Sequence, residues 1–265
     1  MELEQFIIDA FTAEPFKGNP AAVVPVEAWP QDALMQSIAF ENNLSETAFI
    51  KPLPDGDFAI RWFSPLTEVK FCGHATLAAS FVLFRFFGQQ GEIGYQTRHV
   101  GPLRVTQAND GRIRMRFPAL PPTPVEVIPE ALIDGLSLPP VSVWRNLQAY
   151  VAVYENDADV QALQSDSSVL KTLAPYDIVV TAPGSDFDFV SRYFWPANGG
   201  DEDPVTGSIH ACLVPFWAER LGKRELRAYQ ASSRGGVLYC ELEDDAVTVA
   251  GDAVLYLRGR ISVPG

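Results

Sequence analysis

The sequence has 265 residues, enough for two domains of ordinary size. With 20 Lys and Arg against 33 Asp and Glu, its formal net charge is -13, which argues against nucleic acids and anionic membranes as partners. No apolar run reaches the roughly 18 residues of a membrane span, and the acidic start lacks the basic region of a signal peptide. We therefore expect a cytoplasmic protein that binds a small anionic metabolite and can form a homodimer.

The first half of the chain alternates apolar strands with two helices. Helical spacing of apolar residues predicts one helix over residues 32–43, and residues 74–87 hold one charge in fourteen, which is typical of a buried helix. Asn109-Asp110-Gly111 predicts a hairpin turn between two strands. We expect strands over residues 6–11, 21–24, 47–51, 58–63, 95–107 and 112–117.

The second half follows a proline-rich segment, residues 119–124, which is the best linker candidate because three prolines in six residues disfavour helix and central strand. We expect strands near residues 141–143, 149–154, 178–182, 188–194, 237–241, 246–250 and 253–259. Helical character is predicted over residues 159–172 and over 208–221, the latter bent at Pro215. The expected domains are residues 1–118 and 119–265, with the final strand able to cross to the first domain.

Five landmarks of the first half recur in the second half at one constant offset, which predicts an internal duplication. They are Gly73, Gly88, Tyr95, Gln96 and Gly101, repeated as Gly207, Gly222, Tyr229, Gln230 and Gly235. In both copies a glycine opens a largely apolar stretch. Because helix N-termini present free N–H groups and a partial positive charge, two equivalent helix starts facing a common cleft would suit an anionic ligand.

Three clusters carry residues suited to chemistry, and each has a structural alternative. Glu46, in Asn43-Leu44-Ser45-Glu46-Thr47, has apolar neighbours that would fit its carboxyl for proton transfer, whereas an exposed turn glutamate is the structural alternative. His74 opens the first buried helix after Gly73, where it could hold a proton, cap the helix or fill a core pocket. Asp203 and Ser208 flank the start of the second helix, where Asp and Ser are also ordinary caps.

Cys72 is a candidate base because a thiol at a helix N-terminus can have a lowered pKa. Its counterpart at the same constant offset is Thr206, so a symmetric two-thiol racemase lacks its second base. The other cysteines are expected to pack in the core, and His99 and His210 have no partner at metal-ligand spacing. No phosphate-binding or dinucleotide-binding loop pattern is present, so we expect neither a cofactor nor a metal.

Taken in order, several motifs together resemble the PhzF-like (phenazine-biosynthesis) family, which shares its fold with diaminopimelate epimerase. The motifs span the chain: Asp9-Ala10-Phe11, Gly18-Asn19-Pro20, Asn43-Leu44-Ser45-Glu46-Thr47, Phe63-Ser64-Pro65, Cys72-Gly73-His74-Ala75-Thr76 and Glu202-Asp203-Pro204-Val205-Thr206-Gly207-Ser208. The resemblance implies an α/β (α+β) fold of two similar domains, each a mostly antiparallel sheet wrapped around a central helix, with the active site in the cleft between them.

The resemblance also implies roles for individual residues. Glu46 matches the family's acid/base glutamate, and His74 and Asp203 match its site histidine and aspartate. Positions that contact substrate in the family match Ser45, Gly73, Gly207 and Ser208. Cys72 departs from the phenazine-producing enzyme, which has a small non-thiol residue there, and this chain is more similar to the family's Cys-Gly-His branch.

The sequence therefore predicts a biosynthetic, cofactor-independent isomerase that moves a proton on a small carboxylate-bearing metabolite. One alternative is an amino-acid racemase or epimerase that uses Cys72, which Thr206 disfavours. The other is a catalytically silent binding protein of the same fold. Retention of Glu46, His74 and Asp203 together argues against it.

Overall fold

The computed structural model describes residues 1–264, which form two compact units. The first unit comprises residues 1–116 together with the segment from residue 250 onward, and the second comprises residues 117–249. None of the helices in these described residues is long and apolar enough to cross a membrane.

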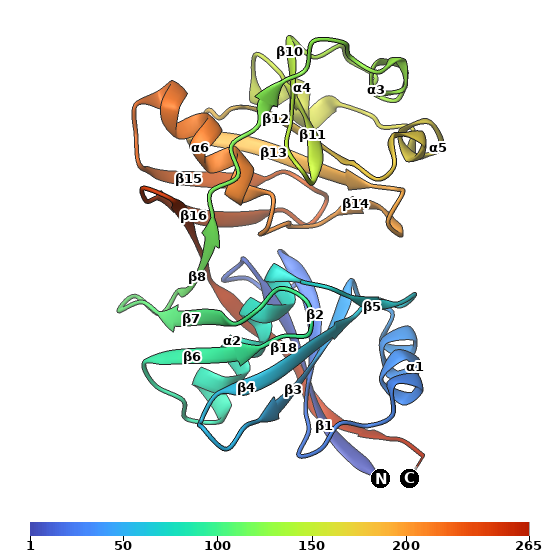
Figure 1. The fold of residues 1–265 in the computed structure, drawn as a ribbon, viewed down its shortest axis with the longest axis vertical. Helices are drawn as coiled ribbons and strands as arrows, with labels where there is room; N and C mark the ends of the chain where they lie inside the picture. Colours follow the sequence, from blue (N-terminus) through green and yellow to red (C-terminus); the bar gives the residue numbers. More distant parts are fainter. Residues whose placement is uncertain (265) are drawn as a thin grey trace. The chain divides into compact units, whose positions relative to one another are not determined.

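The first unit is a mostly antiparallel sheet with a buried helix on one face and an outer helix on the other (Figure 1). Its strands pair in the order β18-β1-β2-β3-β4-β6-β7-β8, with β5 added beside the end of β4. The elements are β1 (Glu2–Ala10), β2 (Asn19–Pro25), α1 (Asp32–Asn42), β3 (Glu46–Pro52), β4 (Phe58–Phe63), β5 (Glu68–Val69), α2 (Gly73–Phe86), β6 (Glu92–Gln96), β7 (Leu103–Gln107), β8 (Ile113–Pro118) and β18 (Ala253–Ser262).

The central helix α2 is apolar on nearly every side because it packs against strands around much of its circumference. It contacts β1, β2, β3, β7 and β18, and its residues are buried from Gly73 through Ser80. The outer helix α1 instead buries one stripe, formed by Met35, Ile38 and Ala39. The predicted sheet wrapped around a central helix is confirmed in this unit.

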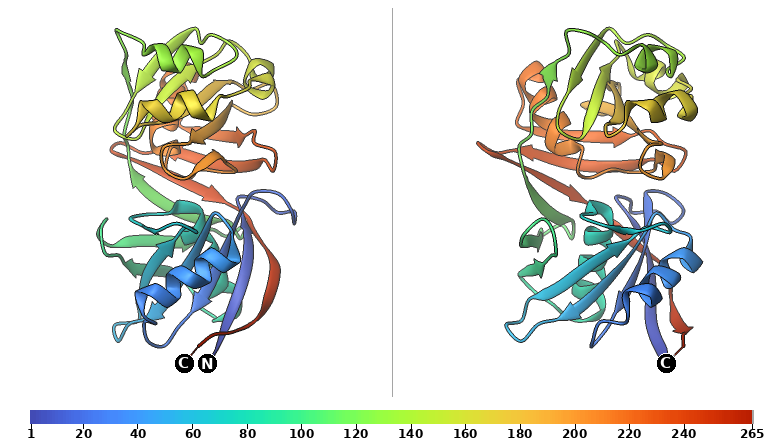
Figure 2. Two further views of the ribbon diagram at one scale, coloured as in Figure 1. Left: turned by 90° about the vertical axis from the view of Figure 1, so that its right-hand side faces the viewer. Right: turned by 45° about the vertical axis from the view of Figure 1, so that its right-hand side comes forward.

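The second unit repeats this plan with additional short helices (Figure 2). Its strands pair in the order β9-β10-β11-β12-β13-β15-β16, with β14 beside the end of β13. The elements are β9 (Thr123–Pro124), α3 (Glu130–Asp134), β10 (Ser142–Arg145), β11 (Ala149–Val153), α4 (Asp157–Ala162), α5 (Ser167–Leu170), η1 (Lys171–Leu173), β12 (Asp177–Pro183), β13 (Phe189–Trp195), β14 (Gly200–Asp203), α6 (His210–Leu221), β15 (Glu225–Gln230), β16 (Gly236–Leu242) and β17 (Ala246–Gly251).

The two units share one succession of strand pairings. From β1 to β7 the pairings are antiparallel, parallel, antiparallel, antiparallel (to β5), parallel and antiparallel, and from β10 to β16 they are the same. We call the short strands β5 and β14 the arm strands. Each arm strand is followed by the buried helix, α2 or α6, which leads into the second strand of a parallel pair, β4–β6 or β13–β15.

Each unit also carries the same partly buried Arg–Glu ion pair. In the first, Nε and Nη2 of Arg61 on β4 donate to the two carboxylate oxygens of Glu68 on β5, at 2.8 and 2.7 Å. In the second, Nε and Nη2 of Arg192 on β13 donate to the two carboxylate oxygens of Glu202 on β14, at 2.8 and 3.0 Å. Each guanidinium also lies 5.1 Å from a ring centroid, that of Phe63 or Phe194. We call these two ion pairs, Arg61–Glu68 and Arg192–Glu202, the Arg–Glu clamps. They hold the arm strands β5 and β14, which lead into α2 and α6.

Three expected elements differ from the structure. The strand predicted over residues 95–107 is two strands, β6 and β7, because the chain turns at Gly101, whose φ is +77°. The helical segment predicted over residues 159–172 is broken, since the Asp166 side chain accepts from the N–H groups of Ser168 and Val169 and starts a new helix. Finally, α6 begins at His210 rather than Ser208. The proline-rich linker candidate contains β9, which pairs with β10.

Candidate active site

Strand alternation places Glu46 toward the buried helix of the first unit. Glu46 is the first residue of β3, and side chains two residues apart on a strand share a face. Phe49, on the opposite face, packs in the cluster around α1. Glu46 therefore lies on the α2 side, where its side chain is buried, which excludes the exposed-turn alternative.

Glu46 and His74 form a buried, directly bonded pair. Nε2 of His74 lies 3.0 Å from Oε2 of Glu46, and the two side chains are only 6% and 9% exposed. The other ring nitrogen, Nδ1, lies 3.1 Å from the amide nitrogen of Asn19, at the start of β2. With that amide donating to Nδ1, the ring carries its hydrogen on Nε2 and donates it to the Glu46 carboxylate. The imidazole is thus oriented from both ends.

Cys72 contacts the same imidazole. Its Sγ lies 3.4 Å from Nδ1 of His74, and the side chain is buried directly before α2. The carboxylate of Glu46, the thiol of Cys72 and the ring of His74 together offer three ligand atoms within 4.8 Å of one another, so this is the group that could hold a metal ion. A metal on Nε2 of His74 would displace the hydrogen that the ring donates to Glu46.

In the second unit, Asp203 ends β14 and is buried just before α6. Oγ1 of Thr206 donates to Oδ2 of Asp203 at 2.5 Å. The side chain of Gln230 completes the arrangement: its Oε1 accepts from the Thr206 N–H at 2.8 Å and its Nε2 donates to the Asp203 carbonyl at 2.8 Å. The residue that corresponds to Cys72 therefore has its hydroxyl committed to a carboxylate.

Three of the four predicted contact residues lie at the starts of the two buried helices, and the fourth lies beside Glu46. Gly73 is the buried first residue of α2, and Ser45 lies half-buried directly before β3. Gly207 and Ser208 form the turn before α6, whose first bonds run from the N–H groups of His210 and Ala211 to their carbonyls. In each unit the preceding N–H groups are thus outside the helical bonding pattern.

The remaining titratable candidates are structural. His210 is fully buried, its Nδ1 bonds the Thr206 carbonyl at 2.9 Å, and burial lowers its pKa to about 4. Burial raises the pKa of the Cys212 thiol to about 12 and raises that of Cys240 as well, so both stay protonated and pack as small apolar residues. His99 is exposed, away from any cluster of candidate metal ligands in the described residues.

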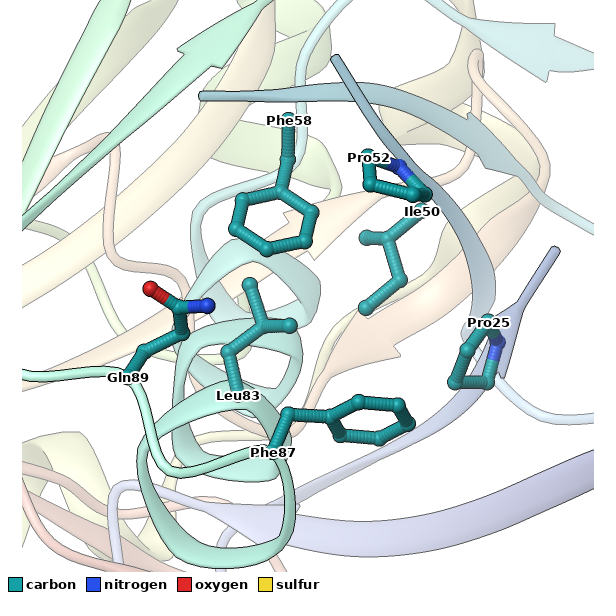
Figure 3. Close-up of a pocket in the computed structure, with 7 residues that line it drawn as sticks. All are labelled: Pro25, Ile50, Pro52, Phe58, Leu83, Phe87 and Gln89. Atoms are coloured by element: carbon teal, nitrogen blue, oxygen red, sulfur yellow. The ribbon is translucent and has the colours of Figure 1, made fainter. Parts of the chain in front are cut away.

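A separate pocket of about 210 Å³ opens near the other end of α2 (Figure 3). It is lined by Pro25, Ile50, Pro52, Phe58, Leu83, Phe87 and Gln89. None of these side chains transfers protons, so this pocket does not compete with the Glu46–His74 pair as a reaction centre.

Sequence reasoning singled out Glu46, His74, Cys72 and Asp203 but assigned no role to the residues that hold them. Asn19 appeared only within a motif, and the two Arg–Glu clamps were missed. Glu68 and Glu202 are separated by the same constant offset as the landmark glycines, and that offset was the signal that could have identified them.

Comparison with known proteins places the chain in a family. The family model described as "Phenazine biosynthesis-like protein" matches residues 8–259. An uncharacterised isomerase of Pseudomonas aeruginosa is 47% identical, with 98% of this chain and 99% of the relative covered. The crystal structure of a PhzF-family phenazine biosynthesis protein from Enterococcus faecalis superposes with a TM-score of 0.94 at 39% identity, covering 99% of this chain and 100% of that one.

A more distant likeness bears on the fold alone. A probable proline racemase from Agrobacterium radiobacter gives a TM-score of 0.66 at 13% identity, covering 99% of this chain and 93% of that one. The epimerase-like fold predicted from the motifs is therefore confirmed. On the match along nearly its whole length, the chain belongs to the PhzF (phenazine biosynthesis-like) family and is an isomerase of that family.

Proposed function

We propose that the chain moves a proton on a small carboxylate-bearing metabolite, with Glu46 as the acid/base and no cofactor. The observation that carries this proposal is the buried contact between Oε2 of Glu46 and Nε2 of His74 at 3.0 Å. A general base must be aimed at the proton that it takes, and the hydrogen bond from His74 fixes the direction of the Glu46 carboxylate.

The reaction balances with this one carboxyl. The Glu46 carboxylate takes a proton from one carbon of the substrate, which leaves a delocalised anion, and the resulting carboxylic acid returns a proton to another carbon. His74 keeps its Nε2 hydrogen toward Glu46 throughout, because Asn19 holds Nδ1. No redox partner or leaving group is needed, which fits an isomerase.

Asp203 is proposed to help hold the substrate rather than to transfer the proton. Its Oδ2 accepts from Thr206 and its main-chain carbonyl accepts from Gln230, so the carboxylate is held in one orientation beside the start of α6. The N–H groups at Gly207 and Ser208 are proposed to take the substrate's carboxylate. The shared succession of strand pairings and the two Arg–Glu clamps support an origin by internal duplication. A cytoplasmic location remains our expectation.

A Cys72-dependent racemase is the second candidate, and the 3.4 Å contact between Cys72 and His74 favours it. An imidazole at this distance could accept the thiol proton. Against it, Thr206 has no thiol and its hydroxyl is bound to Asp203.

The test is an exchange screen in D₂O. The protein is incubated with a mixture of small carboxylic acids from cells, and mass spectrometry identifies any compound that gains deuterium at carbon. Glu46→Gln keeps an oxygen that accepts from His74 but cannot take up a proton as a carboxylate does, so turnover of that compound should fall about 10²- to 10⁴-fold.

Glu41→Gln is the matched control, since Glu41 is exposed on α1, and it should exchange at the wild-type rate. A compound that binds but neither gains deuterium nor changes into an isomer would identify a silent binding protein. Equal rates for Glu46→Gln and the wild type would instead remove Glu46 from the mechanism.

A further inference from the structure

A second chain of hydrogen bonds runs through the other unit and ends at Ser208. Oη of Tyr193 donates to Oδ2 of Asp177 at 2.6 Å, and Nε2 of Gln148 donates to Oη of Tyr193 at 2.8 Å. The same Nε2 also donates to Oγ of Ser208 at 3.1 Å. A line of three side chains thus runs from Asp177 through Tyr193 to Gln148, which contacts Ser208 two residues before α6.

The first member, Asp177, stands where Glu46 stands in the first unit. Glu46 opens β3 and pairs with Ala21 of the parallel strand β2, and Asp177 opens β12 and pairs with Ala149 of the parallel strand β11. Thr181, two alternations along β12 and so on the same face, accepts from the indole of Trp217 in α6. Asp177 therefore faces the buried helix of its unit, as Glu46 does.

Donors and acceptors along this chain can be assigned one by one. A phenol has one hydrogen, which Tyr193 gives to Asp177, so its oxygen accepts from Gln148. Burial raises the pKa of Tyr193 far above its usual range, which keeps the phenol protonated. The amide of Asn198 donates to the second oxygen of Asp177 at 2.7 Å. Both carboxylate oxygens thus receive hydrogen bonds.

This assignment leaves the hydroxyl hydrogen of Ser208 without an acceptor in the described residues. Gln148 uses both Nε2 hydrogens, one toward Tyr193 and one toward Ser208. Ser208 accepts, and its own hydroxyl hydrogen has no acceptor among the side chains and backbone of residues 1–264. Reversing the Gln148 amide would demand the Tyr193 hydrogen that Asp177 already receives.

We propose that Asp177, Tyr193 and Gln148 are positioning residues that fix the Ser208 hydroxyl as a donor to an acceptor oxygen of the substrate. This inference rests on the proposed function, whose substrate carries a carboxylate. A hydroxyl hydrogen directed at the substrate can bond a carboxylate oxygen, whereas an ammonium group has no lone pair to accept it. The hydrogen-bond chain thereby favours an anionic group without using a cationic side chain.

The experiment is a double-mutant cycle measured by binding, which needs no turnover. Benzoate and benzylamine serve as matched probes, titrated into the protein and followed by NMR. Wild type should bind benzoate more tightly, and Ser208→Ala and Tyr193→Phe should each weaken benzoate by about fivefold, the usual worth of one hydrogen bond. The double variant should bind like Ser208→Ala alone, because Tyr193 acts through Ser208.

Tyr154→Phe is the matched control: it also removes a buried tyrosine hydroxyl of this unit, one that donates to the Leu138 carbonyl, away from Ser208. It should lower the melting temperature about as much as Tyr193→Phe while leaving benzoate affinity unchanged. The inference would be overturned if the losses of benzoate affinity in Ser208→Ala and Tyr193→Phe were additive in the double variant. It would also be overturned if Tyr154→Phe lost as much benzoate affinity as Tyr193→Phe, or if the wild type did not bind benzoate more tightly than benzylamine.

Failure here is separable from failure of the proposed function. A cycle that closes as expected, beside a Glu46→Gln variant with full turnover, would keep the positioning chain and reject the acid/base assignment. The opposite pair of results would reject the positioning chain alone.

Discussion

The Arg61–Glu68 clamp gives a specific prediction about stability, because the arginine is buried and the glutamate is only partly exposed to solvent. The Arg61 side chain is 3% exposed and that of Glu68 is 21% exposed. Removing one partner of a fully buried pair costs about 3–5 kcal/mol, whereas an exposed pair contributes about 0.2–1 kcal/mol. Glu68→Gln keeps one acceptor, and Asp32 still contacts Arg61 at 2.7 Å. We therefore expect a loss of about 2 kcal/mol in the free energy of unfolding.

The loss should depend on pH in a defined direction. The hydrogen bonds from Arg61 lower the pKa of Glu68, against the opposing effect of burial. A carboxyl with a lowered folded pKa stabilises fully above its unfolded pKa, about 4.3 for glutamate, and loses that contribution as pH falls through the folded value. The difference between wild type and Glu68→Gln should thus be full at pH 7 and shrink in acid.

Urea unfolding of both proteins at several pH values tests this reasoning, with Arg98→Gln as the control. Arg98 also contacts Glu68, at 3.0 Å, but is 50% exposed, so its removal should cost under about 0.5 kcal/mol. Identical unfolding midpoints for Glu68→Gln and wild type at pH 7 would refute the argument. So would a difference that grows in acid.

Two further predictions concern the Glu46–His74 pair. Cys72→Ser should retain most of the turnover, because a serine hydroxyl can contact Nδ1 of His74 as the thiol does; a loss as deep as that of Glu46→Gln would favour the thiol-base racemase. Dialysis against a chelator should leave turnover unchanged and added Zn²⁺ should inhibit, since Glu46, Cys72 and His74 would become its ligands; activation by Zn²⁺ would contradict cofactor-independent chemistry.

Much of the fold could be predicted from the sequence because periodicity and composition act locally. The buried helix α2 was predictable from a nearly uncharged stretch, and β4 from its apolar residues, to within a residue at each end. The short strands β5 and β14 were not. They have little apolar pattern of their own and are held by bonds to Arg61 and Arg192, which are seven and ten residues away in sequence.

The candidate site was predictable in its residues but not in its bonds. A motif names Glu46 and His74, yet their contact depends on strand alternation and on the first turn of α2 meeting on one side of the sheet. Asp177 gave no signal at all in a sequence scan, because it lies in no motif. Its separation from Glu46 along the chain equals that of Arg192 from Arg61, a relation that is visible only once strand register is known.

The two units place different chemistry on the same scaffold positions. In the first, the carboxylate that opens the strand bonds an imidazole directly and a thiol lies beside it, so proton-transfer groups gather there. In the second, the side chains of Tyr193 and Gln148 lie between the Asp177 carboxylate and Ser208. The position that corresponds to Cys72 holds Thr206, whose hydroxyl is bound to Asp203. A symmetric racemase would need equivalent bases in both units. Because the two units differ in these groups, the arrangement favours the proposed isomerase with a single base over a symmetric two-base racemase.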